Sequence, residues 1–451
     1  MIDRLVERCG FIRSPIIIVL VIFQLSLWSA VFAEKLTLEE SIKLAVQNNP
    51  RAHIALENVK KAYATVDEAT SQGMPKLSLE GTYQRLDEVS VVRFGEREIP
   101  LGSLYTRTAD LILTQPLDVF GIVRAGKRTA KYNTSASKSE YEQVINDITL
   151  ETKKAFFNVL RAEQFLKVQE ENVKALEAHL ADAKAHLAAG TVAQFEVLRA
   201  ETQVANARQQ LIIAQNGLEL AKSAFNNVLA RPLDAQVDLA EPEIPQFAEV
   251  NLKACVDVAL SMRPEIKKAE MQVKAAEEVA RVAMLAGKPR INLRWAYNRS
   301  FDVSTFSPRE SSWRAFLTAS YYIFDGGATK ASVRKATSDA KSAKSMREQT
   351  MRGVTLDVQQ AYLSLRESQE RIKAAEKALE QARESMRLAQ VRYQGGVSTQ
   401  VEVFDAQAAL TLAQTNYVNA IYDYQIALAQ LERAVGGPSQ MAKLLGDRSK
   451  N

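Results

Sequence analysis

The sequence predicts a mainly α-helical chain that also carries membrane β-strands, and three observations lead to this fold class. First, residues 127–189 contain no Pro or Gly and permit one helix of roughly sixty residues, about 95 Å long. Second, the two halves of the chain resemble each other at a nearly fixed spacing. Third, each half contains two short segments of alternating apolar and polar residues. We therefore expect long antiparallel coiled-coil rods and four β-strands per chain.

The long helical stretch has an apolar stripe whose members recur at steps of three, four and seven. These residues are Tyr141, Ile145, Ile148, Ala155, Val159, Ala162, Leu166, Val173, Leu176, Leu180, Ala183 and Leu187. A heptad period sustained over several repeats predicts left-handed coiled-coil packing against neighbouring helices. Because a globular domain has no room for such a helix, the rest of the chain is expected to be built around a rod.

Composition excludes one class of partner. The chain has 451 residues, of which 25% are charged, and 58 Lys and Arg stand against 53 Asp and Glu. Both signs are interspersed along the predicted helices, so we expect no nucleic-acid-binding patch.

The first residues have the pattern of a secretory signal peptide. Basic residues precede an apolar core at 16–27, and Ala33 supplies a small residue before the predicted cleavage site. A membrane anchor is the alternative, but this core is shorter than the roughly twenty residues that span a bilayer. No other apolar run approaches that length, so the mature chain is expected to begin at Glu34 and to contain no transmembrane helix.

Cysteine content predicts a protein without disulfides. Cys9 leaves with the signal peptide, and the remaining Cys255 has no partner within the chain. We expect Cys255 to be a small apolar residue in a helix.

An internal repeat organises the chain. Landmarks in the first part recur 214 positions later, as in Leu38 and Leu252, Pro50 and Pro264, and Gly73 and Gly287. Further on the spacing is 206, as in Gly190 and Gly396, Gln194 and Gln400, and Glu196 and Glu402. The difference is expected to lie in a loop that is longer in the first half.

The domain organisation follows from this repeat. We predict a signal peptide at 1–33, a first structural repeat at 34–230, a linker at 231–250, a second repeat at 251–436 and a tail at 437–451. Each repeat opens with a short helix and a second helix that begins at a proline. A β-hairpin follows at about 76–117 or 289–324, and then a long helical hairpin at 124–230 or 328–435. Between the strands of the first hairpin, residues 88–102 are expected to form a polar loop.

The strand pattern has two interpretations. In the segment 290–297 the apolar residues Ile291, Leu293, Trp295 and Tyr297 share one face, and Asn292 and Arg294 share the other. This is the signature of a transmembrane barrel with a wet interior, but it also fits the edge of a soluble sandwich. The strand pattern alone does not separate the two.

Chain-level geometry favours the barrel and a trimer. Four strands cannot close a barrel, and open edges are not tolerated in hydrocarbon. Two chains would give eight strands, whose interior side chains fill, whereas three chains would give twelve and leave a pore. We therefore predict a trimeric 12-stranded transmembrane β-barrel.

The chain resembles the TolC family of outer-membrane efflux channels. The resemblance is carried by the motif YQGGVSTQVEVFDA at 393–406, the turn IFDGG at 323–327 and the order of elements. It covers nearly the whole mature chain, although the first-half counterpart of the turn, QPLDVFG at 115–121, is a looser match. The resemblance implies a homotrimer in the Gram-negative outer membrane, surrounded by lipid and continued by an α-helical tunnel through the periplasm.

The same resemblance implies the function. The resemblance implies that the protein is a passive exit duct of a tripartite efflux or type I secretion system. Its expected partners are a periplasmic adaptor protein and an inner-membrane pump or ABC transporter. No cofactor or metal is implied. The adaptor is expected to contact the helical tips at Gly190, Thr191, Val192, Gly396, Val397 and Ser398.

Two candidate gate elements follow from the resemblance. Glu402 and Asp405 match acidic residues that ring the periplasmic aperture, and their spacing places both on one helix face. Tyr393 matches a tyrosine that holds the mobile second-half hairpin, and Glu196 matches its acidic partner. Without the resemblance, Glu402 and Asp405 would be read as ordinary solvated charges. Ser398 departs from the pattern, because some relatives have an arginine there, and a second latch is therefore in doubt.

Other functions have less support. The sequence contains no phosphate loop, nucleophile elbow or zinc-type Cys/His spacing, so an enzyme is not expected. His179 and His186 are spaced too far apart for a helical metal site, and we expect both to face solvent. The second class considered is a periplasmic adaptor or structural coiled coil, which would carry one helical hairpin per chain where this chain has two.

Overall fold

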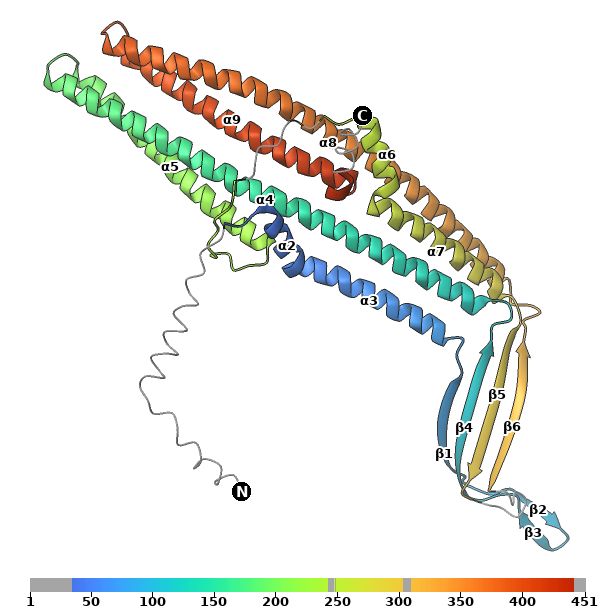
Figure 1. The fold of residues 1–451 in the computed structure, drawn as a ribbon. Helices are drawn as coiled ribbons and strands as arrows, with labels where there is room; N and C mark the ends of the chain where they lie inside the picture. The colour runs from blue at the N-terminus through green and yellow to red at the C-terminus, as the bar shows by residue number, and fades with distance from the viewer. Residues whose placement is uncertain (1–34, 242–246, 248, 303–309, 442–451) are drawn as a thin grey trace, which may run out of the picture. The chain divides into compact units, whose positions relative to one another are not determined.

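The computed structural model describes residues 35–241, 247, 249–302 and 310–441 (Figure 1). The signal peptide predicted at 1–33 and most of the predicted tail lie outside these residues. The first half contains α2 (Leu38–Asn48), α3 (Pro50–Ser71), β1 (Lys76–Arg85), β2 (Val91–Phe94), β3 (Arg97–Pro100), β4 (Tyr105–Leu117), α4 (Ile122–Ala188) and α5 (Gln194–Val228). The second half contains α6 (Leu252–Met262), α7 (Pro264–Ala286), β5 (Arg290–Ser300), β6 (Ser311–Ser320), α8 (Ala328–Gln394) and α9 (Gln400–Val435).

The long helices form as predicted. Helices α4 and α8 each have 67 residues, which corresponds to about 100 Å. Every member of the predicted apolar stripe of α4 is buried or half-buried. Helix α4 begins at Ile122, ahead of Lys127, because the Asp118 carboxylate accepts hydrogen bonds from two backbone N–H groups of its first turn, those of Val123 and Arg124, both at 3.0 Å.

The described chain divides into two compact units. One, which we call the tip unit, comprises residues 35–45, 152–241 and 381–419 and contains the turns that join α4 to α5 and α8 to α9. The other, the sheet unit, comprises 46–151, 247–302, 310–380 and 420–441, apart from residue 248, which the structure does not describe. Among the described residues no helix contains an apolar window long enough to cross a membrane.

The sheet unit has an apolar core between helices α6 to α9. Its fully buried side chains include Val358 and Leu365 of α8 and Tyr424 and Leu431 of α9. Cys255 of α6 lies in the same cluster as a free, buried thiol, as the sequence predicted. Burying side chains of this size contributes roughly 1.5–3 kcal/mol each, so this core is a principal source of the unit's stability.

A network of ion pairs closes one side of this core. The Arg263 side chain is only 4% exposed, and its guanidinium donates to Asp357 at 2.6 Å and to Glu265 at 3.1 Å. Arg433 of α9 donates to Asp357 at 3.1 Å and to Asp147 of α4 at 2.8 Å. Four helices are therefore joined through two arginines whose charges are compensated on several sides.

The four main strands form one antiparallel sheet in the order β1-β4-β5-β6. The register aligns Leu79, Leu111, Tyr297 and Trp313 in one row across the sheet, and Glu80, Asp110, Asn298 and Ser312 in the next. Successive rows point to opposite faces. The sheet thus has an apolar face and a polar face, which agrees with the alternation predicted from the sequence.

The apolar face is uncovered in the single chain. Leu79 is 74% exposed and Trp313 is 69% exposed. In contrast, the most buried residues of the sheet, Ile112 and Ala296, are paired neighbours on the polar face. Side chains crowd one another on the concave side of a curved single-layer sheet, so this burial indicates that the sheet curves toward its polar face.

The loop between β1 and β4 differs from the prediction. A polar loop was expected at 88–102, but strands β2 and β3 pair there as a separate hairpin. Gly95 adopts φ +63° at its turn, which glycine allows without strain. Arg93 donates to Glu98 across the pair at 2.6 Å. Arg93 and Glu98 are among the charged residues that led to the prediction of a loop, and they are cross-strand partners.

The ion network gives a prediction for stability. Replacing Arg263 by Leu leaves two carboxylates partly uncompensated next to a buried core and should lower the free energy of unfolding by about 3–5 kcal/mol. The measurement is chemical denaturation of the detergent-solubilised protein. Arg51→Gln is the control, because Arg51 is 51% exposed in its pair with Glu151 and its loss should cost less than about 1 kcal/mol. Equal effects of the two variants would contradict the assignment.

Candidate functional site: the helical tips

The tips of the two helical hairpins have the same backbone design. Helices α4 and α8 both end at a glycine with positive φ, Gly190 at +76° and Gly396 at +72°. In each turn the residue after this glycine donates its N–H back to the helix: Thr191 to the carbonyl of His186 and Val397 to that of Arg392, both at 3.0 Å. This is the Schellman arrangement, in which only glycine is unstrained at the first position.

The predicted tip residues all lie in these two turns. They are Gly190, Thr191, Val192, Gly396, Val397 and Ser398. Val397 is 69% exposed. Thr191 donates its hydroxyl to the carbonyl of His186 at 2.9 Å, which fixes the first turn further. Hydrogen bonds thus define both turns, which expose Gly190, Thr191, Gly396 and Val397 to solvent.

The acidic pair lies on one exposed face of α9. Glu402 and Asp405 are both exposed, and the residues between them, Val403 and Phe404, are buried. Ser398 donates its hydroxyl to the Glu402 carboxylate at 2.7 Å, and Arg392 lies 3.8 Å from that carboxylate. The structure thus gives Ser398 a local role in orienting Glu402.

The predicted latch residues Tyr393 and Glu196 lie near each other, and a third residue, Gln400, takes part in the contact. Within the part of the chain that the structure describes, the Tyr393 hydroxyl donates no hydrogen bond to Glu196. Instead, the Gln400 side chain lies between Glu196 and His179. With its amide oriented so that oxygen and nitrogen both meet complementary partners, the nitrogen donates to the Glu196 carboxylate and, at 3.2 Å, to its carbonyl, while the oxygen accepts from His179 Nε2 at 3.2 Å. Burial raises the pKa of Tyr393, and the charges of Glu196 and Asp182 raise it further.

His179 lies at the centre of this contact. Its ring centroid is 5.2 Å from that of Tyr393 and 5.0 Å from that of Phe404. The prediction that both histidines face solvent is therefore wrong for His179, although His186 is exposed. Burial lowers the pKa of His179, against the opposing charges of Asp182 and Glu196. The described residues contain no group of three or more His, Cys, Asp or Glu side chains suited to a metal ion.

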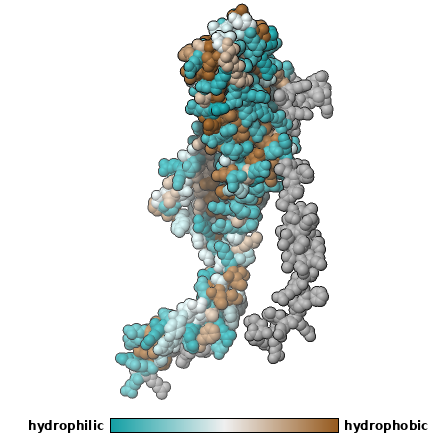
Figure 2. Space-filling view, turned by 90° about the vertical axis from the view of Figure 1, so that its left-hand side faces the viewer, coloured by the Kyte–Doolittle hydropathy of each residue, from teal (hydrophilic) through white to brown (hydrophobic). Residues whose placement is uncertain are grey.

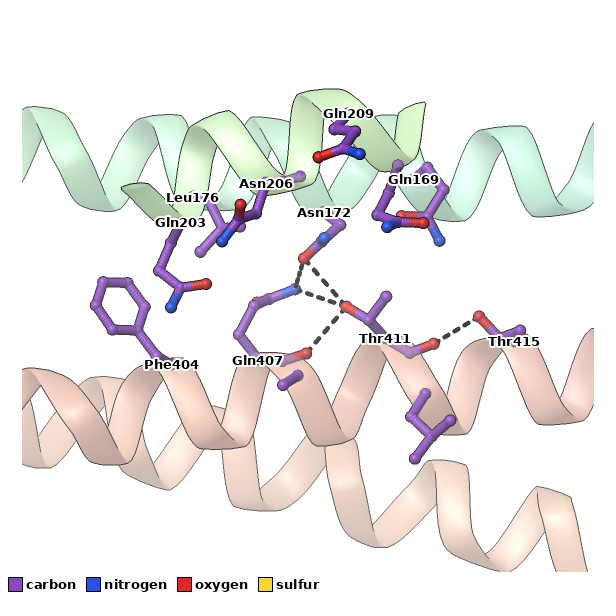
Figure 3. Close-up of a pocket in the computed structure, with 14 residues that line it drawn as sticks. Gln169, Asn172, Leu176, Gln203, Asn206, Gln209, Phe404, Gln407, Thr411 and Thr415 are labelled. Carbon is purple, nitrogen blue, oxygen red and sulfur yellow. Dashed lines mark hydrogen bonds between the residues drawn. The ribbon is translucent and has the colours of Figure 1, made fainter. Parts of the chain in front are cut away.

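A polar groove lies beside this cluster. It has a volume of about 430 Å³ and is lined by α4, α5 and α9 (Figure 3). Most lining side chains are amides or hydroxyls, and none is charged. Asn172 of α4 accepts hydrogen bonds from Gln407 at 3.0 Å and from Thr411 at 3.1 Å, both on α9. These bonds hold the second hairpin against the first.

Sequence reasoning did not find the polar side chains between the hairpins. Gln407 is buried at 7% exposure, and Gln400 is buried at 4%. The alternation in the segment QVEVF, which places Gln400 directly before Val401, is the only signal that the sequence carried. Such a residue must find partners when it is buried, but the sequence does not say on which helix they lie.

Comparisons with known proteins agree with this architecture. The family model described as "Outer membrane efflux protein" matches residues 41–231 and 255–437. The chain is 24% identical to Nodulation protein T of Rhizobium leguminosarum bv. trifolii over 428 residues, 92% of this chain and 89% of that protein. It is 23% identical to Outer membrane protein TolC of Vibrio cholerae over 434 residues, 92% and 93% of the two chains. A solved structure of CusC superposes with a TM-score of 0.79 at 20% identity, covering 91% of this chain and 94% of that one.

The burial of His179 predicts that the tips loosen in acid. A folded tip holds the pKa of His179 below its ordinary value, so below about pH 6.5 the opened tip binds a proton that the closed tip does not. Amide-exchange protection in residues 176–200 and 386–407 should therefore be full at about pH 7.5 and fall at about pH 5.5.

Two variants test this assignment. His179→Phe keeps an aromatic ring beside Tyr393 and Phe404, and its protection should change little between these pH values. His186→Phe is the matched control and should keep the pH response of the natural protein. The charged groups that face His179 are Asp182 and Glu196, and Tyr393, whose pKa is raised by burial, ionises above this window. An unchanged pH response in His179→Phe would assign the effect to another group.

Proposed function

Since this chain belongs to the outer membrane efflux protein family, we propose that three copies of it form a passive exit duct that an adaptor and an inner-membrane transporter load from the periplasm. The family places the chain in the outer membrane as an efflux channel. The proposal adds the trimer, the closed barrel, the gate at the helical tips and the partners. Catalysis is no part of this function.

One observation carries the trimer: the sheet has two free edges. Strand β1 pairs only with β4, and β6 pairs only with β5, in the described chain. Unpaired backbone N–H and C=O groups are not tolerated in hydrocarbon, so each edge requires a strand from a neighbouring copy. Two copies would give eight strands and a filled interior, whereas three give twelve strands and an open one.

The two faces of the sheet support this closure. The apolar face, with Leu79 and Leu317 exposed at 74% and 63%, suits contact with lipid. Curvature toward the polar face would direct that face into a pore filled with water. Tyr83 and Tyr105 lie together on the apolar face with ring centroids 6.3 Å apart, as expected of an aromatic girdle at the membrane interface.

The helices also leave apolar surface without a partner. Figure 2 shows hydrophobic residues between hydrophilic ones on the helices. Ile212 and Leu220 of α5 are 60% and 71% exposed, and Leu412 of α9 is 62% exposed. Exposed apolar residues at helical spacing indicate a further packing surface. Neighbouring copies would cover it and build a helical wall around the lumen.

The domain plan is part of the proposal. The order helix, helix, strand, strand, long helix, helix occurs from α2 to α5 and again from α6 to α9, with β2 and β3 as an insertion. The two matched segments of the family model fall on these halves. Both facts support a duplicated chain with repeats at 34–230 and 251–436 and a linker between them.

The gate is proposed at the contact between the two hairpins of each tip. Opening would separate α9 from α4 and break the contacts of Gln400 with Glu196 and of Asn172 with Gln407. In the trimer, Glu402 and Asp405 would form stacked rings of carboxylates that attract cations. The exposed turns at Gly190 and Gly396 would contact the adaptor, because they are the rigid ends of both hairpins.

The trimer and the pore can be tested together. The mature protein extracted from outer membranes should migrate as a trimer before heating and as a monomer after it, and it should form ion-conducting channels in planar bilayers. A Pro substitution at Leu317 of β6 removes an N–H near the free edge and should abolish both properties, whereas Val92→Pro in the separate β2–β3 hairpin should preserve them. A monodisperse, water-soluble single copy would exclude the proposal.

The latch prediction concerns conductance. The double variant Tyr393→Phe and Glu196→Gln removes the tyrosine hydroxyl and replaces the charge-assisted hydrogen bond from Gln400 to Glu196 by a neutral one. The loss is at most roughly 1.5–3 kcal/mol and should raise the open fraction at least several-fold. Single-channel recording is the measurement. Glu201→Gln is the matched control, because Glu201 pairs with Lys184 at 2.9 Å inside the first hairpin. Unchanged conductance in the double variant would rule out this latch.

A further inference from the structure

The polar face of the sheet has an uneven distribution of charge. Four cations lie on this face, and they are Lys76 of β1, Arg290 and Arg294 of β5, and Arg314 of β6. We call them the basic band. The acidic residues of this face, Glu80 and Asp110, share one row of the register. Lys76 and Arg294 share a row that is four residues, about 13 Å, from the acidic row. Arg314 lies between these two rows, and Arg290 lies on the far side of Arg294 from the acidic row. The cations thus occupy one part of the polar face, and the carboxylates lie at its edge.

The basic band is uncompensated. Among the described residues none of its four cations has a carboxylate within ion-pair distance, although Arg107 of β4 pairs with Asp302 at 2.9 Å. Asp110 instead accepts from the Asn298 amide at 2.9 Å. The charges of the band are therefore not used to hold the sheet together, and they remain available to a solute.

Arg294 is built to bind an anion. Its guanidinium lies over the ring of Phe316, with Cζ 5.9 Å from the ring centroid. Its Nε atom is buried and donates no hydrogen bond within the described structure. A guanidinium whose plane is held by an aromatic ring presents its N–H groups at the edge, and this fork matches a phosphate, sulfate or carboxylate group.

We propose that the basic band is an anion-binding lining of the pore that recognises solutes carrying phosphate, sulfate or carboxylate groups. This inference rests on the proposed function, because the basic bands of neighbouring copies surround one lumen only when three sheets form one barrel. Rings of Lys and Arg select anions in other pores by the same electrostatics. A multivalent anion would bridge bands of neighbouring copies and bind more tightly than a monovalent one.

Sided block of the channel tests the proposal. The purified trimer is placed in a planar bilayer, and inositol hexakisphosphate is added to each chamber in turn at low salt. The natural channel should be blocked at a lower concentration from the chamber that the barrel faces, and the block should weaken as KCl is raised. The double variant Arg294→Gln and Arg314→Gln should raise the half-blocking concentration by about tenfold or more.

Three further variants separate charge from folding. Arg294→Lys with Arg314→Lys keeps the charge and should retain most of the block. Lys76→Gln, at an exposed end of β1, should weaken the block on its own without the arginine changes. Arg299→Gln is the matched control, because Arg299 lies on the opposite face of β5, in register with Ala109, and should leave the block unchanged.

The outcomes distinguish this inference from the proposed function. Channels that conduct normally but are blocked equally with and without the basic band, or that the polyanion does not block at all, would overturn the anion-binding lining and leave the exit duct intact. A mature protein that forms neither trimers nor channels would overturn both.

Discussion

The unpaired backbone of strands β1 and β6 is the constraint on which the rest of this structure depends. A four-stranded sheet with an apolar face needs a lipid or protein environment for that face, yet its edges need hydrogen bonds that lipid does not supply. Closure with further copies satisfies both demands. In the proposed barrel, the same closure would determine which side chains line the pore, including the charges of the polar face.

The helices also need neighbours to pack against, and small residues at their buried positions allow this packing. Buried positions of α5 include Ala200, Val204, Ala207 and Ala214, and such side chains allow close approach of neighbouring helices. Close packing buries the hairpin's inner seam but leaves larger residues such as Leu220 facing outward. A helical hairpin that is apolar on two sides gains stability as part of a larger wall, and the proposed trimer would supply partners for the helices and for the sheet.

Contacts within a hairpin and between hairpins differ in kind. Within the first hairpin, apolar residues such as Val173, Leu176 and Val204 form a continuous cluster, and Phe404 is the buried residue of the second hairpin that joins it. Between the hairpins, many of the contacts are neutral hydrogen bonds of amides, each worth roughly 1 kcal/mol net. A set of weak, separable bonds between long helices suits a gate, because opening it would expose amides and Phe404 while the apolar seam within the first hairpin stays closed.

Residue periodicity was enough to predict the rods, the strands and the exposed acidic pair, since all three depend on local spacing. The roles of Gln400, Asn172 and His179 were not predictable, because their partners lie on helices distant in the sequence.

The arginines of the sheet unit have two kinds of surroundings, and the contrast supports the proposed pore face. Arg263 is nearly buried and touches carboxylates of two different helices, as a dehydrated charge must. Among the described residues, Arg290, Arg294 and Arg314 have no carboxylate partner, although Glu80 and Asp110 lie on the same face. Cations without a carboxylate partner need water or a polar solute to solvate them. In the proposed barrel one face of the sheet meets lipid, so the lumen would supply that water.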